Sequence, residues 1–475
     1  MTRTVPVDTH TPRHWLPLVS SCLGTFLLLV YTTIVTVAVG PIGAELHAGF
    51  GARLWIVDVF TVALAGLLLG MGSLSDVLGR RRVYLVGLTV FGLATLACGL
   101  VGSAGQLIAA RAVQGVAGAA MFATILPLVG LSYHGRDRAR AFAVWGTTAG
   151  VAGAAGTLAG GVVTQLVGWR WIFLGSLPVC VVALVLAARS LVETDRAPGR
   201  VDAPGIASFT VAASAGTYTV INGGDRGFTA VSTLLGAALT VLAALAFVLV
   251  ERASAHPMLP PRLFGTRAFV GVLVVAFGYY FATYGPGPVL SAWLQDDTGL
   301  SPLATSLVLT GQIVAFFLVS ALLSGRLHAL PPGRVLGGAT LLIGFGCLTA
   351  LAVYAEPGWL ALAPALLVTG AGAGMVSPVF PAVAIAAVPP AFGGTAAAAA
   401  NSSRQLGLAL GIAICGALFA RRTTGAEAPG SATGAEAGAA GVADALLCCG
   451  VLALVTGAVA WWLLRTPDRA GRLAG

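Results

Sequence analysis

Lysine is absent from the 475-residue sequence, so all 26 basic residues are arginine. A phosphate-binding loop of the G-x-x-x-x-G-K-[ST] type and a Schiff-base lysine are therefore excluded. Charge is also scarce, because charged residues make up 9% of the chain, against roughly 25% in a soluble globular protein. So few charges cannot cover a water-exposed surface. The chain is predicted to face lipid and to draw energy for any uphill work from an ion gradient or a partner chain.

Metal-ligand spacing is missing among the seven cysteines, which all lie in apolar stretches. They are interpreted as small buried hydrophobic residues, and neither a metal site nor a cofactor is expected. The formal net charge is +9, but the arginines lie between apolar stretches. That placement is typical of topology signals that face anionic lipid, not of a nucleic-acid surface. Neither nucleic acid nor nucleotide is expected as a partner.

Long apolar stretches dominate what is present: 57% of the residues are hydrophobic and the mean hydropathy is +0.93. A membrane helix needs ~20 apolar residues to cross the hydrocarbon layer. The sequence therefore predicts an all-α membrane protein with fourteen transmembrane helices. The predicted spans are 16–40, 54–73, 83–102, 107–130, 140–165, 171–190, 204–222, 230–250, 267–294, 303–325, 333–353, 358–380, 394–420 and 442–464.

The arginine distribution predicts the orientation of these spans. With the N-terminus inside, the cytoplasmic segments hold 19 arginines and the opposite side holds five, while Arg111 and Arg404 fall within helices. This asymmetry satisfies the positive-inside rule. It predicts a multi-pass protein of a bacterial cytoplasmic membrane with both termini in the cytoplasm. The Ala- and Gly-rich segment 423–441 is predicted to be a flexible external linker.

A weak internal repeat suggests two related halves. The segment 72–82 after the second span and the segment 325–334 after the tenth both begin Gly-x-Leu and later carry Gly-Arg. Transporters are often built from such repeats. The predicted organisation is an N-terminal six-helix bundle (1–203), two inserted linker helices (204–266) and a C-terminal six-helix bundle (267–475).

The first of these segments reads Gly72-x3-Asp76-x2-Gly79-Arg80-Arg81. It resembles the signature loop of the major facilitator superfamily, and it follows the second span on the predicted cytoplasmic side. A carboxylate at this helix end can pair with a nearby arginine or face a helix N-terminus. Asp76 is therefore expected to form a latch that locks one conformation and releases in another. The alternative is a solvated acid in a turn.

Other segments strengthen the resemblance. Arg111-x2-Gln114-Gly115 resembles the second motif of the superfamily, and an arginine inside a membrane helix needs an acidic or carbonyl partner. Trp169-Arg170-Trp171-Ile172-Phe173 and Gln295-x3-Gly299-x-Ser301-Pro302 resemble the 14-helix branch of drug:proton antiporters.

Glycines recur every three or four residues along span 140–165, and this pattern resembles the superfamily's antiporter motif. Small residues on one helix face allow a partner helix to approach closely. The family pattern has Gly-Pro where this chain has Gly156-Thr157, so the packing face is kept and the kink is left open. The residues assigned to helix packing are Gly150, Gly156, Thr157, Gly160 and Gly161.

Asp58 is the one acid among 17 that falls well inside a predicted helix. Intramembrane carboxyl groups are functional by default. Removal from water favours the protonated carboxyl, whereas a nearby arginine favours the carboxylate. Asp58 is therefore expected either to couple transport to protons, with Arg111 nearby, or to act as a structural partner of Arg111 at similar depth. The stretch Trp55-Ile-Val-Asp58 also resembles organic-cation exporters of this branch.

The first span departs from that branch. Its stretch Val30–Val35 resembles a motif that carries Asp where this chain has Tyr31. In relatives this acid is tied to proton coupling or cation binding, and tyrosine does not release a proton near neutral pH. The chain is expected either to favour neutral or anionic substrates or to rely on Asp58 alone.

The C-terminal half offers aromatic and polar residues for a substrate. Aromatic rings with polar tips suit a pocket for flat amphipathic molecules, although they also suit a helix–lipid interface. The pair Arg404-Gln405 could contact an anionic group of a substrate or cap neighbouring carbonyls. The residues assigned to the substrate cavity are Tyr31, Gln114, Tyr280, Tyr284, Arg404 and Gln405.

The predicted function is export of a drug-like small molecule or secondary metabolite by alternating access, driven by protons. The alternative is a specific importer or uniporter on the same fold. An enzyme is not expected, because a membrane-embedded catalytic pair is missing from the predicted helices. The partners are a small-molecule substrate, protons and the lipid bilayer, and the chain is expected to function as a monomer.

Overall fold

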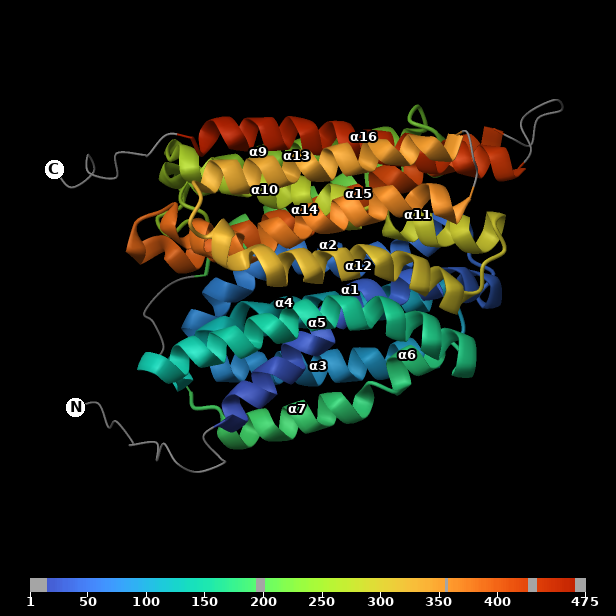
Figure 1. The fold of residues 1–475 in the computed structure, drawn as a ribbon. Coiled ribbons are helices and arrows are strands. Elements are labelled where there is room, and N and C mark those ends of the chain that lie inside the picture. The colour runs from blue at the N-terminus through green and yellow to red at the C-terminus, as the bar shows by residue number, and fades with distance from the viewer. Residues whose placement is uncertain (1–14, 194–200, 355–357, 426–433, 466–475) are drawn as a thin grey trace, which may run out of the picture.

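The computed structural model describes residues 15–193, 201–354, 358–425 and 434–465. Within these residues the chain is helical and carries no strand. The α-helices are α1 (Leu16–Glu45), α2 (Phe50–Leu78), α3 (Arg80–Leu100), α4 (Ala104–Ser132), α5 (Gly135–Val167), α6 (Arg170–Leu174), α7 (Leu177–Ser190), α8 (Ala203–Arg226), α9 (Val231–Ala253), α10 (Arg267–Tyr284), α11 (Gly287–Ala292), α12 (Pro302–Leu327), α13 (Pro332–Thr349), α14 (Trp359–Ala386), α15 (Gly393–Gly425) and α16 (Gly434–Leu463). They run side by side along one direction (Figure 1).

Thirteen helical stretches of the described chain are long and apolar enough to cross a membrane. α8 is the fourteenth, because its 24 residues reach across a bilayer even though it is less apolar than the others. Four spans combine shorter elements: α6 joins α7, α10 continues through α11 into a π-helical turn (Trp293–Asp297), α13 continues into a 3-10 turn (Ala350–Tyr354), and a 3-10 turn (Pro390–Phe392) leads into α15. The prediction of an all-α membrane protein with fourteen spanning helices is confirmed.

The predicted linker 423–441 is wrong at both ends. α15 continues to Gly425 and α16 begins at Gly434. Alanine has the highest helix propensity, and the alanines near the start of α16 extend that helix. Residues 426–433 lie outside the described part of the chain.

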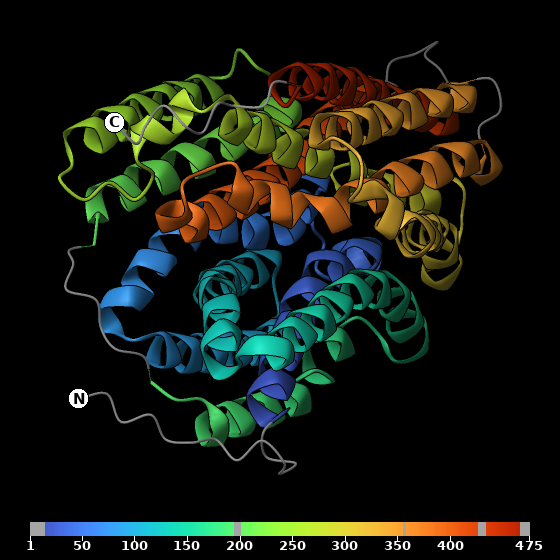
Figure 2. The same ribbon diagram turned by 60° about the vertical axis from the view of Figure 1, so that its left-hand side comes forward.

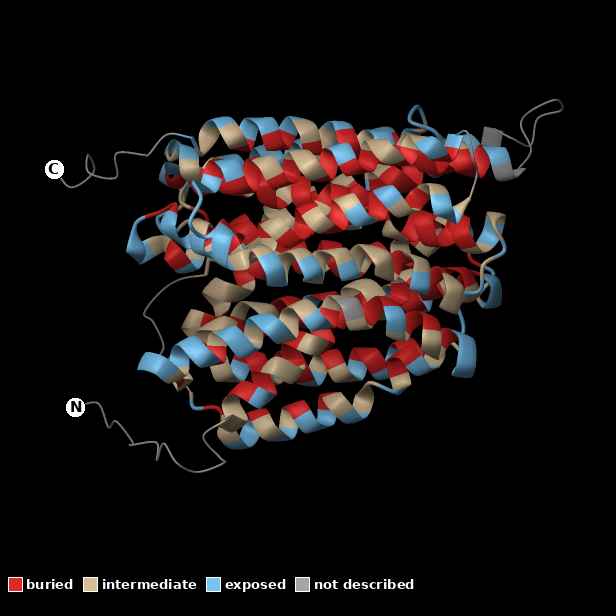
Figure 3. Ribbon diagram, viewed as in Figure 1, coloured by how far each residue is buried: buried red, intermediate tan, exposed pale blue. Residues whose placement is uncertain are grey.

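Large apolar side chains cover the outer faces of the bundle. Leu166 and Leu322 are 73% and 74% exposed, which water would penalise and lipid would not. Figure 3 shows buried positions following the inner faces of the helices and exposed positions following the outer ones. The chain is therefore a multi-pass membrane protein.

Two separate hydrophobic cores organise the helices. One core, here called the N-terminal core, consists mainly of residues between Leu27 and Leu191. The other, the C-terminal core, consists mainly of residues between Met258 and Ala460. Figure 2 shows the blue and teal helices gathered below the orange and red ones.

Two seams join these groups of helices. In the first, α5 packs on α12, with Gly150 against Phe317. In the second, α2 packs on α15, with Leu54 against Gly416 and the hydroxyl of Ser402 donating to the carbonyl of Ala65 at 2.7 Å. The second seam places the middle of α2 directly against the C-terminal group of helices.

The hairpin of α8 and α9 lies on the second seam. Thr210 of α8 lies against Gly66 of α2, and Gly224 of α8 lies against Ala417 of α15. α8 therefore contacts one helix of each group and covers the line where they meet. Figure 2 shows this green hairpin at the edge of the C-terminal group.

Candidate functional site

Asp58 lies in α2, deep in the packed interior. Its exposed fraction is 0%, and both carboxyl oxygens lack a hydrogen-bond partner among the described residues. A buried carboxylate without a partner costs several kcal/mol, so such groups are rare outside functional sites. Asp58 is thus an acid whose charge the surrounding protein does not stabilise.

The face of α2 that carries Asp58 points toward α15. Leu54 and Ala65, which both contact α15, are separated from Asp58 by four and seven residues. With 3.6 residues per turn, all three lie on one side of the helix. Asp58 therefore lies in the α2–α15 seam.

The inserted helix α8 supplies a polar neighbour at the same level. α2 and α8 cross antiparallel, because Gly51 lies against Asp225 whereas Gly66 lies against Thr210. Position 58 of α2 then lies opposite Thr217, which is on the same face of α8 as Thr210, two turns away. Thr217 is fully buried and its hydroxyl has no partner among the described residues. Two unpaired buried polar groups thus occupy one three-helix seam.

Sequence reasoning missed Thr217. The span 204–222 contains several Ser and Thr residues, and this polarity was the available signal. The rotation of α8 that turns Thr217 rather than its neighbours toward α2 depends on tertiary packing, which the sequence pattern does not reveal.

Arg111 of α4 is stabilised by oxygen atoms of uncharged groups. Its guanidinium donates to the carbonyls of Ile56 and Tyr31, both at 3.2 Å, and to Oε1 of Gln114 at 2.6 Å. The amide of Gln114 donates in turn to the hydroxyl of Thr95 at 2.7 Å. All five donors of an arginine need acceptors when buried, and this network provides the carbonyl partners that the sequence called for.

The alternative in which Asp58 is the structural partner of Arg111 is wrong. The two residues lie at similar depth, since Arg111 bonds the carbonyl of Ile56. However, α4 packs on the face of α2 that carries Phe60. Residues two apart on a helix point to opposite sides, so Asp58 is turned away from Arg111.

Tyr31 is packed into the N-terminal core. Its hydroxyl donates to the carbonyl of Ile172 at 3.0 Å and lies 2.6 Å from the hydroxyl of Ser176. Its ring contacts those of Phe91 and Phe173, with centroids 5.5 and 5.7 Å away. In this conformation neither Tyr31 nor Gln114 is accessible, and both belong to the surroundings of Arg111.

Arg404 of α15 is at the centre of a second group. Its guanidinium donates to the hydroxyl of Tyr280 and, at 3.1 Å, to Oδ1 of Asn401. The guanidinium carbon also lies 4.3 Å from the ring centroid of Tyr280 and 5.7 Å from that of Phe380. The ring of Tyr280 meets that of Tyr284 at 5.1 Å. The structure thus brings three of the predicted cavity residues together.

The fourth, Gln405, follows Arg404 and is 3% exposed, with Oε1 unpaired among the described residues. No hydrogen bond, ion pair or ring contact joins this group to Tyr31 or Gln114 in the part of the chain that the structure describes. The six residues assigned to one cavity therefore fall into two groups.

The turn between α2 and α3 carries the latch residues. Asp76 accepts from Arg80 at 2.8 Å within the turn.

Gly79 has a φ of 102°, which favours glycine, and a side chain there would strike the carboxylate of Glu193. Glu193 accepts from the backbone amides of Arg81 and Arg82 at 3.0 and 3.2 Å. A carboxylate at a helix N-terminus is stabilised by the dipole of α3. Glu193 was not singled out from the sequence, and the predicted arginine partner of Asp76 is Arg80. Gly72 has open space around it.

Polar contacts join the N-terminal and the C-terminal group of helices at the end of the bundle where α1 ends and α2 begins. Arg53 of α2 pairs with Asp296 at 2.9 Å. The amide of Gln295 donates to the carbonyl of Val37 in α1 at 3.0 Å. This end, predicted to be outside, is therefore closed in the present conformation.

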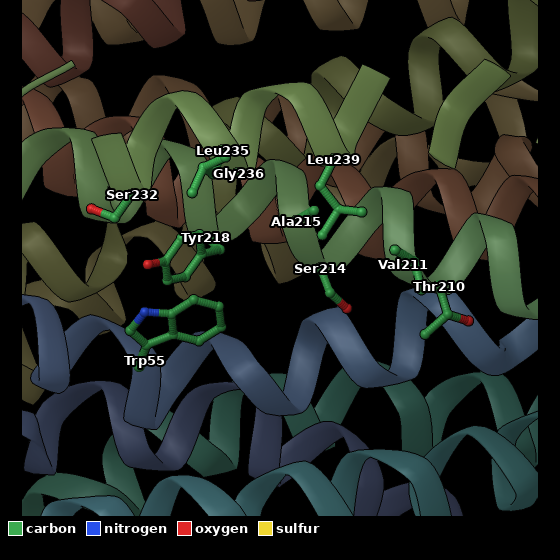
Figure 4. A pocket seen from close by; sticks show the side chains of 10 residues that line it. All are labelled: Trp55, Thr210, Val211, Ser214, Ala215, Tyr218, Ser232, Leu235, Gly236 and Leu239. Atoms are coloured by element: carbon green, nitrogen blue, oxygen red, sulfur yellow. The ribbon is translucent and has the colours of Figure 1, made fainter. Parts of the chain in front are cut away.

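A pocket lies elsewhere, between α2, α8 and α9 (Figure 4). It has a volume of about 600 Å³, and Trp55, Tyr218 and Leu239 help to line it. None of its lining residues is charged, and Asp58 is not among them. The pocket offers no proton-carrying group.

Comparison with known proteins decides the family. The family model described as Major Facilitator Superfamily matches residues 21–412 and 272–475. This chain belongs to the Major Facilitator Superfamily. Members of this superfamily are membrane transporters and not enzymes.

Within the superfamily, the chain is similar to bacterial resistance and export proteins. It is 31% identical to the methylenomycin A resistance protein of Streptomyces coelicolor, over 94% of this chain and 91% of that protein. It is 32% identical to the puromycin resistance protein pur8 of Streptomyces alboniger, with 99% and 96% covered. It is 33% identical to the cephamycin export protein CmcT of Amycolatopsis lactamdurans, with 86% of each covered.

Solved structures agree on the fold. The chain matches a bacterial homologue of the lysosomal transporter Spinster, in an inward-facing and unoccupied conformation, with a TM-score of 0.67, 16% identity, and 96% and 98% of the two chains covered. An auto-inhibited POT family peptide transporter matches with a TM-score of 0.68, 13% identity, and 96% and 97% covered. At these identities the likeness shows the fold alone.

The antiporter-type glycines of this superfamily member serve two partner helices. Gly156 and Gly160 lie against α1, whereas Gly150 and Gly161 lie against α12. Consecutive residues point about 100° apart on a helix, so the glycines cover two faces and not the single face expected. α5 runs unbroken through Gly156 and the buried Thr157.

The different surroundings of Arg111 and Asp58 predict different stabilities for their variants. Arg111→Ala removes three hydrogen bonds and leaves the buried Oε1 of Gln114 without its donor, which should cost at least about 2 kcal/mol. Asp58→Asn removes no hydrogen bond and should leave the melting temperature nearly unchanged. Thermal unfolding of the detergent-purified protein, followed by tryptophan fluorescence, measures both. A strongly lowered melting temperature for Asp58→Asn would contradict the unpaired position of the carboxyl group.

Proposed function

We propose that this protein exports a drug-like small molecule or secondary metabolite across the bacterial cytoplasmic membrane by alternating access, in exchange for protons. The observation that carries the proposal is the fully buried, unpaired carboxyl group of Asp58 between α2, α8 and α15. The names of the relatives support the export of antibiotics: methylenomycin A, puromycin and cephamycin.

Asp58 would carry the proton. An ionised carboxylate without a partner in hydrocarbon costs several kcal/mol, so the group is neutral in the packed seam. When the α2–α15 seam loosens, water reaches the carboxyl, and its O–H proton passes to that water. The charged form then persists only while the seam is hydrated. Protonation would in this way be tied to which side of the membrane the transporter opens toward.

The proton gradient supplies enough energy for such a cycle. Each pH unit contributes ~1.4 kcal/mol per proton, and each 100 mV of membrane potential contributes ~2.3 kcal/mol per charge. One proton therefore supports a concentration ratio of at least roughly tenfold per pH unit.

The moving parts would be the N-terminal bundle (1–203) and the C-terminal bundle (267–475), with the inserted helices between them (204–266). Separate hydrophobic cores support this division, although α8 contacts both α2 and α15. The arginine asymmetry supports an orientation with both termini in the cytoplasm. The single chain carries both groups of helices, so a monomer would suffice.

Asp58→Asn tests the coupling. The variant cannot release a proton, so it should lose export while remaining folded. Cells that lack their own efflux pumps would express each variant and be challenged with puromycin and a cephamycin, with and without an uncoupler. Wild-type resistance should vanish with the uncoupler, and Asp58→Asn should lower it to the level of empty cells.

The control is Asp137→Asn at the start of α5, where the carboxylate pairs with Arg140 at 3.6 Å. This variant should keep wild-type resistance. Undiminished, uncoupler-sensitive resistance from Asp58→Asn would remove Asp58 from the mechanism.

Thr217→Val tests the contribution of α8 to the proton site. The hydroxyl can donate to the carboxylate once the seam is hydrated, and a hydrogen bond to a charged group contributes about 1.5 kcal/mol. Its loss should raise the pH of half-maximal exchange in everted vesicles by up to about one unit. Thr217→Ser keeps the hydroxyl and should restore the profile. An unchanged pH profile in Thr217→Val, at normal protein levels, would show that Thr217 only fills space.

Asp76→Asn tests the latch at the turn between α2 and α3. Loss of the pairing with Arg80 should slow the conformational change and leave the binding site intact. The maximal rate of export should fall severalfold while KM stays near the wild-type value. A raised KM at an unchanged maximal rate would identify a different role. Asp137→Asn again serves as the control.

A further inference from the structure

Arg404 differs from the other arginine that lies within a membrane helix. Arg111 donates to two backbone carbonyls and the amide oxygen of Gln114. The bonded partners of Arg404 are a hydroxyl and one amide oxygen, those of Tyr280 and Asn401. Its Nε is inaccessible and unpaired, and no carboxylate lies within ion-pair distance in the described residues. The charge of Arg404 is only partly compensated.

That incomplete compensation is costly in this location. An arginine at the middle of a membrane helix is costly unless it is paired. Cation–π contacts with the rings of Tyr280 and Phe380 offset part of that cost. A partly compensated Arg404 lowers the stability of the fold, and such residues are typical of binding sites.

The position of Arg404 is the place where a transported molecule must pass. Tyr280 and Tyr284 pack against both the N-terminal and the C-terminal core. Leu408, one turn beyond Arg404 on α15, belongs to the N-terminal core. Arg404 therefore lies between the two groups of helices, where alternating access requires the cargo to bind.

Asp58 does not neutralise Arg404. The face of α15 that meets α2 carries Ser402 and Gly416. Arg404 is two residues from Ser402, so the two side chains leave α15 on opposite sides. The ion pairs of the described chain, such as Arg53 with Asp296 and Arg422 with Asp444, include neither Asp58 nor Arg404.

We propose that Arg404 binds the carboxylate of an exported compound whose flat apolar part rests on the rings of Tyr280, Tyr284 and Phe380. The proposal rests on the proposed export function and names its substrate class. A carboxylate takes the Nε and Nη hydrogens of an arginine in a bidentate pair, displacing the hydroxyl of Tyr280. The aromatic rings exclude water from that pair and strengthen it.

The proposal fixes how much charge crosses the membrane in each cycle. Export of a monoanion against one inbound proton moves two charges, so the membrane potential contributes twice the energy that it contributes for one charge. Export of a neutral compound moves one charge, and export of a monovalent cation moves none. An anionic cargo therefore makes transport steeply dependent on membrane potential.

Three fluorescent probes with one ring system test the site: dansylglycine (anion), dansylglycinamide (neutral) and a dansyl-alkyl trimethylammonium (cation). Binding to the purified full-length protein is followed by dansyl fluorescence. The wild type should bind the anion at least tenfold more tightly than the amide, and the cation more weakly than either. Arg404→Gln should weaken anion binding at least tenfold and leave amide binding unchanged. Arg422→Gln, which removes an arginine at the end of α15, should change neither.

Tyr280→Phe keeps the proposal testable if Arg404→Gln does not fold. Without the hydroxyl that competes for the guanidinium, anion affinity should stay equal to that of the wild type or rise, even if the melting temperature falls. A tenfold loss of anion affinity in Tyr280→Phe would overturn the proposed displacement. In proteoliposomes, an inside-negative potential with protons supplied outside should accelerate export of the anion more than export of the amide.

Failure of this inference can be told apart from failure of the export function. Equal binding of the three probes, with uncoupler-sensitive puromycin resistance intact, overturns the anion site and leaves export standing. Resistance that is insensitive to uncouplers overturns the proton coupling, whatever the probes show. Anion selectivity that survives in a folded Arg404→Gln protein overturns the assignment of Arg404.

Discussion

The cost of placing a charge in hydrocarbon organises this molecule. Arg111, Asp58 and Arg404 lie away from the ends of their helices, and each meets that cost differently. Arg111 is surrounded by carbonyl and amide oxygens and joins α1, α2 and α4 into one unit. Asp58 has no partner among the described residues and is stable there when neutral. Arg404 has partial compensation from neutral groups and aromatic rings. Arg111 therefore has a structural role, whereas Asp58 and Arg404 are the groups proposed to bind a proton and a substrate.

Helix rotation determines which of these outcomes each residue has. α2 shows this most clearly, because its three faces meet three different neighbours. Phe60 lies on the face that packs on α4, Gly66 on the face that packs on α8, and Leu54 on the face that packs on α15. Asp58 falls on the last face, so an acid in an N-terminal helix is buried by a C-terminal one. A small relative movement of α2 and α15 therefore changes the solvation of the carboxyl directly.

The sequence allowed the fold to be predicted because membrane insertion is governed by local composition. Hydropathy located the spans, although the end of α15 and the Ala-rich start of α16 were misassigned as linker. The burial of Asp58 and the need of Arg111 for carbonyl partners were also foreseeable. The direction in which each side chain points was not, since a uniformly apolar helix has little amphipathic pattern to reveal its rotation. That missing information led to the mistaken pairing of Asp58 with Arg111, and it concealed Thr217.

Contacts that close turns were missed for a related reason. Glu193 lies far from Arg81 and Arg82 in the sequence, yet it binds both of their backbone amides. Glu45 similarly accepts from Trp169 at 2.6 Å and pairs with Arg170. Neither glutamate belongs to a motif segment, although each holds a motif segment in place. Motifs identify the residues that move or bind, and the residues that position them come from the tertiary structure.

The separation of Asp58 from Arg404 limits how transport can be coupled. In direct competition, cargo and proton would share one group and exclude each other by contact. Here Arg404 leaves α15 on the side opposite to Ser402, which faces α2 and therefore Asp58, so a carboxylate bound at Arg404 does not touch Asp58. Coupling must then pass through α15 itself, whose packing on α2 sets the solvation of Asp58 and whose packing on α10 positions Arg404. Cargo binding and protonation would both shift the same equilibrium between the packed and the loosened α2–α15 seam. A shared equilibrium of this kind is the physical requirement for linkage between distant sites. Because that linkage does not depend on the shape of the cargo, one proton site can serve compounds that share little beyond a negative charge and a flat apolar surface.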